Sequence, residues 1–289
     1  MIKKSLTIFA SCLAFAVLLA PPAPAQSPAA GPSPAPKVEP KPAAPPPQQQ
    51  TVDEKAEGIL RRAVEALGGA SYLNIKSVIG RGNYTPYGQG APGDIIAFVD
   101  YLIYPDRERT DYKGQGVRSI QTNIGADKGW VYDGMTKTIS DMKAEQFEDF
   151  RTSLRTSVDN LLRGEWRREG ASLAYAGRRE AGLARRNEAV RVTYPDGFTV
   201  DFEFGARDGL PAKVLYKRTI KTEDEKEAVV TEEDRIERYL TFGGVQVPFT
   251  IDHYRDGVQS SRIAYDSVEF NPAIPDTLFA KPANPKAIK

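Results

Sequence analysis

The sequence predicts a mainly β protein: an antiparallel, unclosed (half) β-barrel of about eleven strands, with two amphipathic helices covering its concave face. Three observations support this fold class. Most of the chain after residue 74 consists of short segments in which apolar and polar residues alternate. Gly and Asp-Gly turns separate these segments closely enough for hairpins. Two other segments instead repeat their apolar residues at helical spacing.

The first helical segment runs from about residue 52 to residue 67. Its apolar residues recur at steps of three and four, which places them on one face: Val52, Ala56, Ile59, Leu60, Ala63, Val64 and Leu67. Thr51 followed by Glu54 is the pattern of a capping box, and Gly68-Gly69 is typical of a helix end. We expect a short amphipathic helix packed on the sheet.

Five strands are expected next, because β-branched and aromatic residues are enriched between glycine and aspartate breaks. They cover residues 75–85, 94–104, 107–113, 117–124 and 128–132. Asp133-Gly134 then predicts a hairpin turn. After this turn the period becomes that of a second amphipathic helix near 143–164, whose apolar residues are Phe147, Phe150, Leu154, Val158, Leu161 and Leu162.

The rest of the chain returns to strands. Residues 198–204 alternate completely between apolar and polar side chains, which is typical of a strand with one covered and one wet face. Six strands are expected in this region, at 190–194, 198–204, 214–220, 227–240, 244–254 and 258–270. Consecutive hairpins require an antiparallel meander. A meander of about eleven twisted strands curls towards a barrel or half-barrel.

The N-terminus predicts export. Lys3 and Lys4 precede an uncharged stretch from residue 5 to residue 20, and Ala23-Pro24-Ala25 fits a cleavage site. Residues 1–25 are therefore interpreted as a signal peptide, cleaved near Ala25, that directs the domain to the periplasm. An uncleaved anchor is the alternative, but the apolar run is shorter than the roughly 20 residues that a spanning helix needs. Cys12 lies inside this run rather than at its end, which favours a hydrophobic role over lipidation.

Residues 26–50 are rich in Pro, Ala and Gln and are interpreted as a disordered tether. The folded domain is expected at 51–283, with a flexible tail at 284–289. Without Cys12 the mature chain has no cysteine, which excludes disulfides and cysteine-based sites. Loss of two of the 39 basic residues leaves 37 against 38 acidic ones. This near-neutral balance predicts no nucleic-acid partner, and the cleaved product is not expected to be an integral membrane protein.

Catalysis is not predicted. His253 is the one histidine, and no metalloprotease, redox, hydrolase, P-loop or dinucleotide motif is present. Ser260, Ser261 and Asp252 lie near His253 in the sequence, but catalytic triads assemble in space. His253 is interpreted as a rim histidine at the end of a strand. The protein is therefore expected to be a non-enzyme without a cofactor or a metal site.

Two charged clusters have alternative interpretations. Acidic residues surround the predicted hairpin at 221–229: Glu223, Asp224, Glu225, Glu227, Glu232, Glu233 and Asp234. They could form a carboxylate pair for glycoside hydrolysis or a hard-metal site, but the interleaved basic residues favour a solvated, charge-balanced turn. An arginine cluster could meet an acidic partner or lipid phosphates: Arg163, Arg167, Arg168, Arg178, Arg179, Arg185 and Arg186. Arg81 and Arg109, within predicted strands, are candidates for the rim or lid of a cavity.

Four segments carry a family resemblance: ILRRAVEALGGASYLNIKSVIGRG at 59–82, YPDRERTDY at 104–112, GWVYDG at 129–134 and a C-terminal segment at 242–282. In order and pattern they resemble the periplasmic outer-membrane lipoprotein carrier LolA and the wider group of lipoprotein-sorting proteins. The resemblance implies an unclosed barrel whose concave apolar surface, lidded by helices, shields acyl chains. It also covers relatives that sense lipids or misfolded envelope proteins, or that bind regulatory partners.

The function expected from these features is binding or transport of an apolar ligand, with lipid or lipoprotein acyl chains as partners. The residues expected to contact it are Phe98, Phe147, Phe150, Leu154, Val192, Phe198, Val200, Phe202, Val214, Tyr216, Phe249 and Ile251, of which Phe147, Phe150 and Leu154 belong to the lid. The same side chains could instead form an ordinary core. The alternative function is a protein-interaction or sensor module of the envelope, with no lipid cargo.

Overall fold

The structure, a computed structural model, describes residues 8–10, 13–15, 50–88, 90–222 and 226–288. Most of the predicted signal peptide, with Cys12 and the cleavage site at Ala25, lies outside the described residues, as do the tether up to residue 49 and Glu223, Asp224 and Glu225. Within the N-terminal region, strands β1 (Ile8–Ala10) and β2 (Leu13–Phe15) pair with each other.

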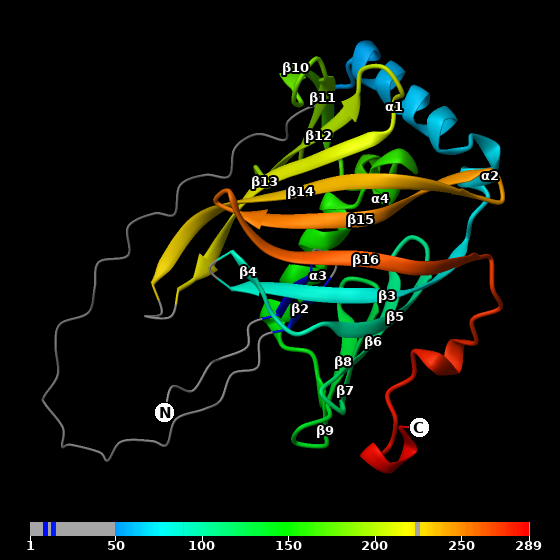
Figure 1. Ribbon diagram of the computed structural model, residues 1–289, viewed down its shortest axis with the longest axis vertical. Coiled ribbons are helices and arrows are strands. Elements are labelled where there is room, and N and C mark those ends of the chain that lie inside the picture. Colours follow the sequence, from blue (N-terminus) through cyan, green and yellow to red (C-terminus); the bar gives the residue numbers. More distant parts are fainter. Residues whose placement is uncertain (1–7, 11–12, 16–49, 89, 223–225, 289) are drawn as a thin grey trace, which may run out of the picture.

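One antiparallel sheet of 14 strands organises the described part of the domain. Its strand order is β10-β11-β12-β13-β14-β15-β16-β3-β5-β6-β7-β8-β9, and β4 pairs with β3 alone. Consecutive strands are neighbours except where β16, the last strand, pairs with β3. The sheet curves around the helices and stays open, with β9 and β10 at its two edges (Figure 1). The predicted fold class is confirmed.

The strands fall into two sets separated by helices. The first set is β3 (Ser77–Gly88), β4 (Ala91–Pro92), β5 (Ile96–Ile103), β6 (Arg107–Gly114), β7 (Val117–Ile124), β8 (Lys128–Asp133) and β9 (Thr138–Asp141). The second set is β10 (Ser172–Glu180), β11 (Arg186–Thr193), β12 (Thr199–Gly205), β13 (Pro211–Lys221), β14 (Glu227–Phe242), β15 (Val245–Arg255) and β16 (Val258–Phe270).

Three of these strands, β4, β9 and β10, are absent from the sequence prediction. β4 and β9 are too short to show a period. In β10, a register shift between Tyr175 and Gly177 interrupts the alternation on which the prediction depends.

The long helices differ from their predictions at their ends. α1 (Glu54–Leu67) is capped by Asp53, whose Oδ1 accepts a hydrogen bond from the Ala56 amide at 2.9 Å, so the predicted capping box at Thr51 is wrong. Gly68, with φ 127°, ends the helix as expected. The predicted second helix is two helices, α3 (Ala144–Thr156) and α4 (Val158–Leu162), because Ser157 is extended and its hydroxyl caps α4.

Shorter helices complete the chain: α2 (Ala70–Leu73), η1 (Glu165–Arg167), η2 (Asp276–Leu278) and η3 (Pro285–Ala287). The last two belong to a C-terminal segment held against β8, where the Trp130 indole donates to the Phe279 carbonyl at 2.8 Å. Phe279 is buried there. In the part of the chain that the structure describes, no helix is both long and apolar enough to cross a membrane.

Candidate functional site

A cavity of about 250 Å³ lies between the concave face of the sheet and the helices α3 and α4. Strands β3, β5, β15 and β16 supply most of its apolar wall, including Tyr84, Phe98, Ile251 and Ile263. Phe150 and Leu154 of α3 close it from the opposite side. The cavity is therefore a space between a sheet and a separate helical cover.

The register of the sheet brings the wall residues together. Ile263 pairs with Tyr84 across β16 and β3, and Phe98 pairs with Tyr112 across β5 and β6. The Phe98 and Tyr265 rings meet edge to face with their centroids 5.5 Å apart. Gly80 leaves room for this arrangement, because a Cβ at that position would lie 2.8 Å from the Tyr265 ring. Residues distant in the sequence thus form one continuous apolar surface.

The part of the cavity wall formed by β5 and β6 includes polar side chains. Asp100, Glu108 and Thr110 line the cavity and are buried. The Thr110 hydroxyl donates to Asp100 Oδ1 at 2.6 Å. Burial raises the pKa of the Asp100 carboxyl to about 7, against the lowering effect of this hydrogen bond. Burial, together with neighbouring Asp100, raises the pKa of Glu108 well above its usual range.

His253 also lines the cavity, and its predicted place at the rim is wrong. The imidazole is buried, and its Nδ1 lies 2.6 Å from Asp234 Oδ1. Asp252, the sequence neighbour considered as its partner, instead receives two hydrogen bonds from Arg262, at 2.6 and 2.8 Å. The Ser260 hydroxyl donates to the His253 carbonyl oxygen rather than contacting its ring.

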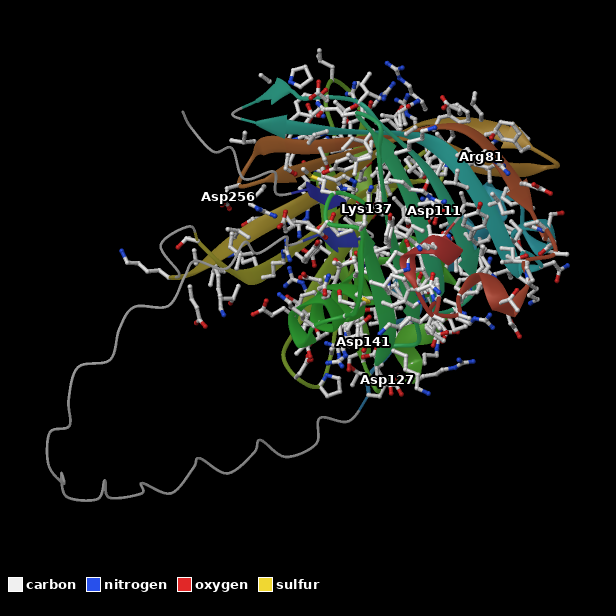
Figure 2. All side chains as sticks on the ribbon, turned by 90° about the horizontal axis from the view of Figure 1, so that it is seen from below. Arg81, Asp111, Asp127, Lys137, Asp141 and Asp256 are labelled. Atoms are coloured by element: carbon white, nitrogen blue, oxygen red, sulfur yellow. The ribbon has the colours of Figure 1, made fainter. Side chains whose placement is uncertain are left out.

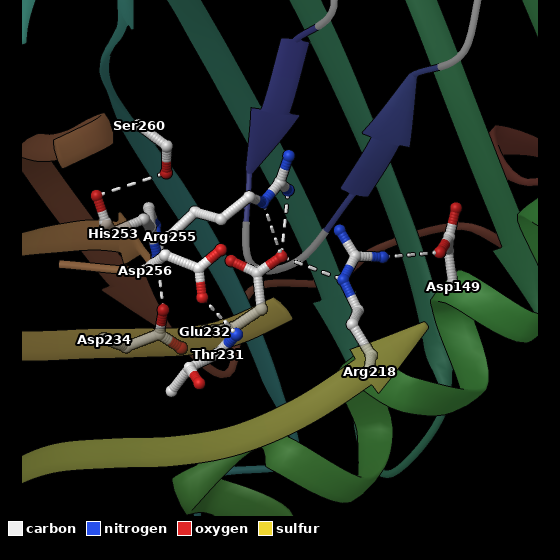
Figure 3. Close-up of polar contacts among 9 residues, drawn as sticks. All are labelled: Asp149, Arg218, Thr231, Glu232, Asp234, His253, Arg255, Asp256 and Ser260. Atoms are coloured by element: carbon white, nitrogen blue, oxygen red, sulfur yellow. Dashed lines mark hydrogen bonds and ion pairs between the residues drawn. The ribbon is translucent and has the colours of Figure 1, made fainter. Parts of the chain in front are cut away.

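A partly buried ion network joins the sheet to the helical cover (Figure 3). Glu232 Oε1 accepts from Arg218 Nε at 2.9 Å and from Arg255 Nη2 at 2.8 Å. Arg218 also donates to Asp149 Oδ1 of α3 at 3.0 Å. The interpretation of Glu232 and Asp234 as solvated turn residues is therefore wrong, because β14 extends past the hairpin and turns both carboxylates inward. No group of three His, Cys, Asp or Glu residues that could hold a metal ion occurs among the described residues.

The structure separates the apolar residues predicted to contact a ligand. Those that line the cavity are Phe98, Phe150, Leu154, Val214 and Ile251. Those that do not are Phe147, Val192, Phe198, Val200, Phe202, Tyr216 and Phe249. Five of this second group belong to, or pack against, a core cluster with α1, namely Val192, Phe198, Val200, Phe202 and Tyr216. Phe249 stacks on Phe242 with the ring centroids 6.0 Å apart.

Neither arginine predicted at the rim or lid lines the cavity. Arg81 is exposed and follows Gly80, which faces inward, so its side chain points to the outer face (Figure 2). Arg109 lies on the opposite face of β6 from Glu108 and Thr110. It donates to Asp111 at 2.7 Å and to the Leu278 carbonyl at 2.6 Å, and so helps to hold the C-terminal segment.

The arginine cluster is largely paired within the domain. Ion pairs join Arg167 to Glu57, Arg168 to Glu165, Arg178 to Glu188, Arg179 to Asp201 and Arg186 to Glu180. Arg163 differs, because its guanidinium lies over the Tyr104 ring at 4.1 Å and donates to the Tyr72 and Leu73 carbonyls. These contacts neutralise much of the positive charge that the sequence alone suggests.

Sequence reasoning missed the polar part of the cavity. One signal was available: Asp100 is the one charged residue between 95 and 104, in the middle of an otherwise apolar strand. Burial of a carboxyl is costly unless it is hydrogen-bonded or neutralised, so an isolated acid in an apolar strand indicates a position with polar partners. Glu108 and His253 gave no comparable signal, since their sequence neighbours are largely polar.

Comparisons with known proteins support the fold. No protein-family model matches the sequence, and no curated protein matches it either. Among solved structures, a LolA superfamily protein from Nitrosomonas europaea is 12% identical, with a TM-score of 0.52, and the match covers 78% of this chain and 97% of that one. A DUF1329 family protein from Desulfovibrio piger is 10% identical, with a TM-score of 0.54 and the same coverage. The chain therefore has a LolA-like fold.

Proposed function

We propose that this protein binds an apolar ligand, the acyl chain of a lipid or of a lipidated protein, in the cavity beneath α3 and α4. The observation that carries the proposal is the cavity itself, which stays open between apolar walls while the neighbouring part of the concave face is filled by side chains. The predicted signal peptide supports a place of action in the periplasm, and the LolA-like fold is consistent with a carrier.

The size of the cavity favours a ligand with one apolar chain. Its volume of about 250 Å³ is slightly below the roughly 300–1,000 Å³ typical of ligand pockets. Each buried methylene stabilises the complex by about 0.8 kcal/mol. A single chain can therefore supply useful affinity after the entropic cost of binding, without any catalytic group.

The helical cover supplies a route of entry. Phe150 is 2% exposed and Leu154 is partly exposed, so α3 closes the cavity with a few apolar contacts. The Asp149–Arg218 ion pair fastens the same helix to the sheet. The extended Ser157 separates α3 from α4, so we expect α3 to be able to move as a short unit. Outward movement of α3 would admit the chain and its return would shield it from water.

The test uses the full chain, produced with its own N-terminus and purified without detergent. Extraction and mass spectrometry identify any bound lipid, and displacement of a neutral acyl fluorophore measures affinity. Leu154→Trp fills the cavity from α3 and should weaken probe binding about tenfold or more. Phe147→Trp, on the same helix but outside the cavity, is the matched control and should bind as the parent does.

Two results would contradict the proposal. One is a purified protein with no lipid and no affinity for the fluorophore. The other is equal binding by both tryptophan variants. The alternative, an envelope protein-interaction or sensor module without lipid cargo, predicts the first result.

A further inference from the structure

We propose that the cavity recognises a ligand whose apolar chain ends in a primary ammonium group, held by Glu108 and Asp100 where β5 and β6 cross the wall. This inference rests on the proposed binding function and adds the chemistry of the ligand's polar end. It comes from a cluster of buried hydrogen-bond acceptors that the protein itself leaves without donors.

Two of the unpartnered acceptors line the cavity from different elements. Glu108, on the sheet side, is 6% exposed and its Oε1 has no partner among the described residues. Asn160, on the α4 side, is also 6% exposed, and its Oδ1 has no partner there either. Both residues line the cavity. The cavity therefore has one unpartnered acceptor from the sheet and another from the helical cover.

Further buried polar side chains lie on β7, the strand next to β6. Gln121 and Asn123 of β7 pair in register with Thr110 and Glu108, so they share the inner face of the sheet. Both are buried, and Gln121 Oε1 and Asn123 Oδ1 lack partners among the described residues, as does Asn123 Nδ2. The four side chains together thus present four unpartnered oxygens and one unpartnered nitrogen donor.

A primary ammonium group fits this arrangement because it has three N–H donors and no acceptor. An alcohol has one donor and satisfies fewer of these oxygens. A carboxylate cannot donate to these oxygens, and its negative charge would oppose ionisation of Glu108 and Asp100. Unmade hydrogen bonds of buried groups are costly, so the difference between these ligands should be large.

Among the described residues, no arginine pairs with Glu108 or Asp100, so a cation of the ligand can do so. Arg107 also lines the cavity, but its Nη2 donates to Asp276 Oδ1 at 2.6 Å, and the Arg163 guanidinium lies over the Tyr104 ring. Within the described chain, neither arginine forms an ion pair with Glu108 or Asp100. The other titratable side chains nearby are Asp106, Asp159 and Asp234, which line the cavity, Asp111 behind β6, tyrosines that include Tyr72 and Tyr104, and His253, which pairs with Asp234.

Binding of a cation should also release protons. Burial raises the pKa of Glu108 and of Asp100, so the empty site holds protons near neutral pH. An adjacent ammonium group favours the ionised carboxylate and lowers both pKa values. Calorimetry in two buffers of different ionisation enthalpy should show proton release with the amine and none with an uncharged ligand.

The experiment compares decylammonium, decanol and decanoate as competitors of the neutral fluorophore, with the full chain. We expect decylammonium to bind about tenfold or more tightly than decanol, and decanoate to bind weakest. Glu108→Gln should lower the affinity for decylammonium more than the affinity for decanol, so that the preference for the amine is lost. Asp127→Asn, which removes an exposed carboxylate on the β7–β8 turn, is the control and should keep the preference (Figure 2).

The outcomes separate the two proposals. Failure of all three ligands overturns the binding function itself. Equal binding of decanol and decylammonium overturns the ammonium site and leaves the apolar site standing. If Glu108→Gln does not fold, the calorimetry on the parent decides, because amine binding without proton release overturns the inference.

Two sources could supply the ammonium group, an aminophospholipid or a simple alkylamine. Competition by lysophosphatidylethanolamine, but not by lysophosphatidylcholine, would identify the lipid headgroup. Competition by decylammonium alone would identify the alkylamine. Equal competition by both lysophospholipids would contradict recognition through N–H donors.

Discussion

Two regions of the same concave face differ in how they are filled. Beside α1, strands β11, β12 and β13 contribute side chains such as Val190, Val200 and Phe204 that are fully buried in a closed core. Beneath α3 and α4, strands β3, β5 and β16 contribute Tyr84, Phe98 and Ile263, which are also buried but border a cavity. Inward-facing apolar residues therefore do not distinguish a core from a binding site.

The helices that cover the two regions account for the difference. α1 is a continuous helix of 14 residues whose buried face includes Ala56, Ile59 and Leu60, and it packs closely on the sheet. The second cover is interrupted at Ser157, and its longer part, α3, buries only Gln146, Phe150 and Thr156. Fewer apolar contacts and more polar groups leave this cover looser over the cavity.

The largest expected effect is on the free energy of unfolding, and it tests whether the region beside α1 is a closed core. Phe202→Ala should lower the free energy of unfolding by about 3–5 kcal/mol, because it leaves a void among fully buried neighbours. Phe98→Ala should cost less, since its side chain already borders open space. Urea denaturation of both variants measures the two costs. Equal losses would remove the proposed contrast in packing.

A smaller effect should appear in the pH dependence of stability. The pKa of Asp100 is about 7 in the folded protein and near 3.8 when unfolded, so the folded state holds the proton more tightly. The stabilisation of the folded state by this bound proton is complete below pH 3.8 and is lost as pH rises to about 7. The free energy of unfolding of Asp100→Asn is compared with that of the parent at each pH. This difference should be more favourable to the variant above pH 7 than at pH 4, by about 1 kcal/mol or more.

Thermal denaturation at several pH values measures this gain. Thr110 and Asp111 act on the Asp100 carboxyl, and the raised pKa of Glu108, to which Asp100 contributes, shifts stability in the same direction. Asp127→Asn, at an exposed turn, is the control and should follow the parent. A parallel pH profile for Asp100→Asn and the parent would refute a strongly raised pKa at this site.

The smallest effect concerns the attachment of α3. Asp149→Asn weakens the contact with Arg218 and should cost about 0.5–1 kcal/mol of stability. It should also speed release of a bound fluorophore, which stopped-flow mixing can measure. Glu148→Gln is the matched control, because Glu148 pairs with Arg151 inside the same helix. Similar release rates for the two variants would mean that the ion pair does not hold the cover.

Much of the fold could be predicted from the sequence. Period-two alternation located strands such as β12, and helical spacing located α1 and the α3–α4 region, because these periods follow from backbone geometry. The strand β10 was missed because its bulge breaks the period. Asp53 replaced Thr51 as the helix cap, a difference of two positions that local pattern cannot resolve.

The candidate site was only partly predictable. Phe98, Phe150, Leu154, Val214 and Ile251 were identified by their apolar alternation and line the cavity. Phe202 has the same pattern and lies in the core instead, because α1 rather than α3 lies over its part of the sheet. Ligand contact by any of these residues stays a prediction until binding is measured.

For strands with regular alternation, such as β12, the sequence by itself determined which side faces inward, since side-chain direction alternates with every residue. Only the tertiary structure decided where that inner face is filled and where it is hollow. This depends on the pairing of β16 with β3 and on the separate placement of α1 and α3. The same long-range contacts bury Asp100, Glu108 and His253 in one wall, because burial and charge depend on neighbours that are distant in the chain.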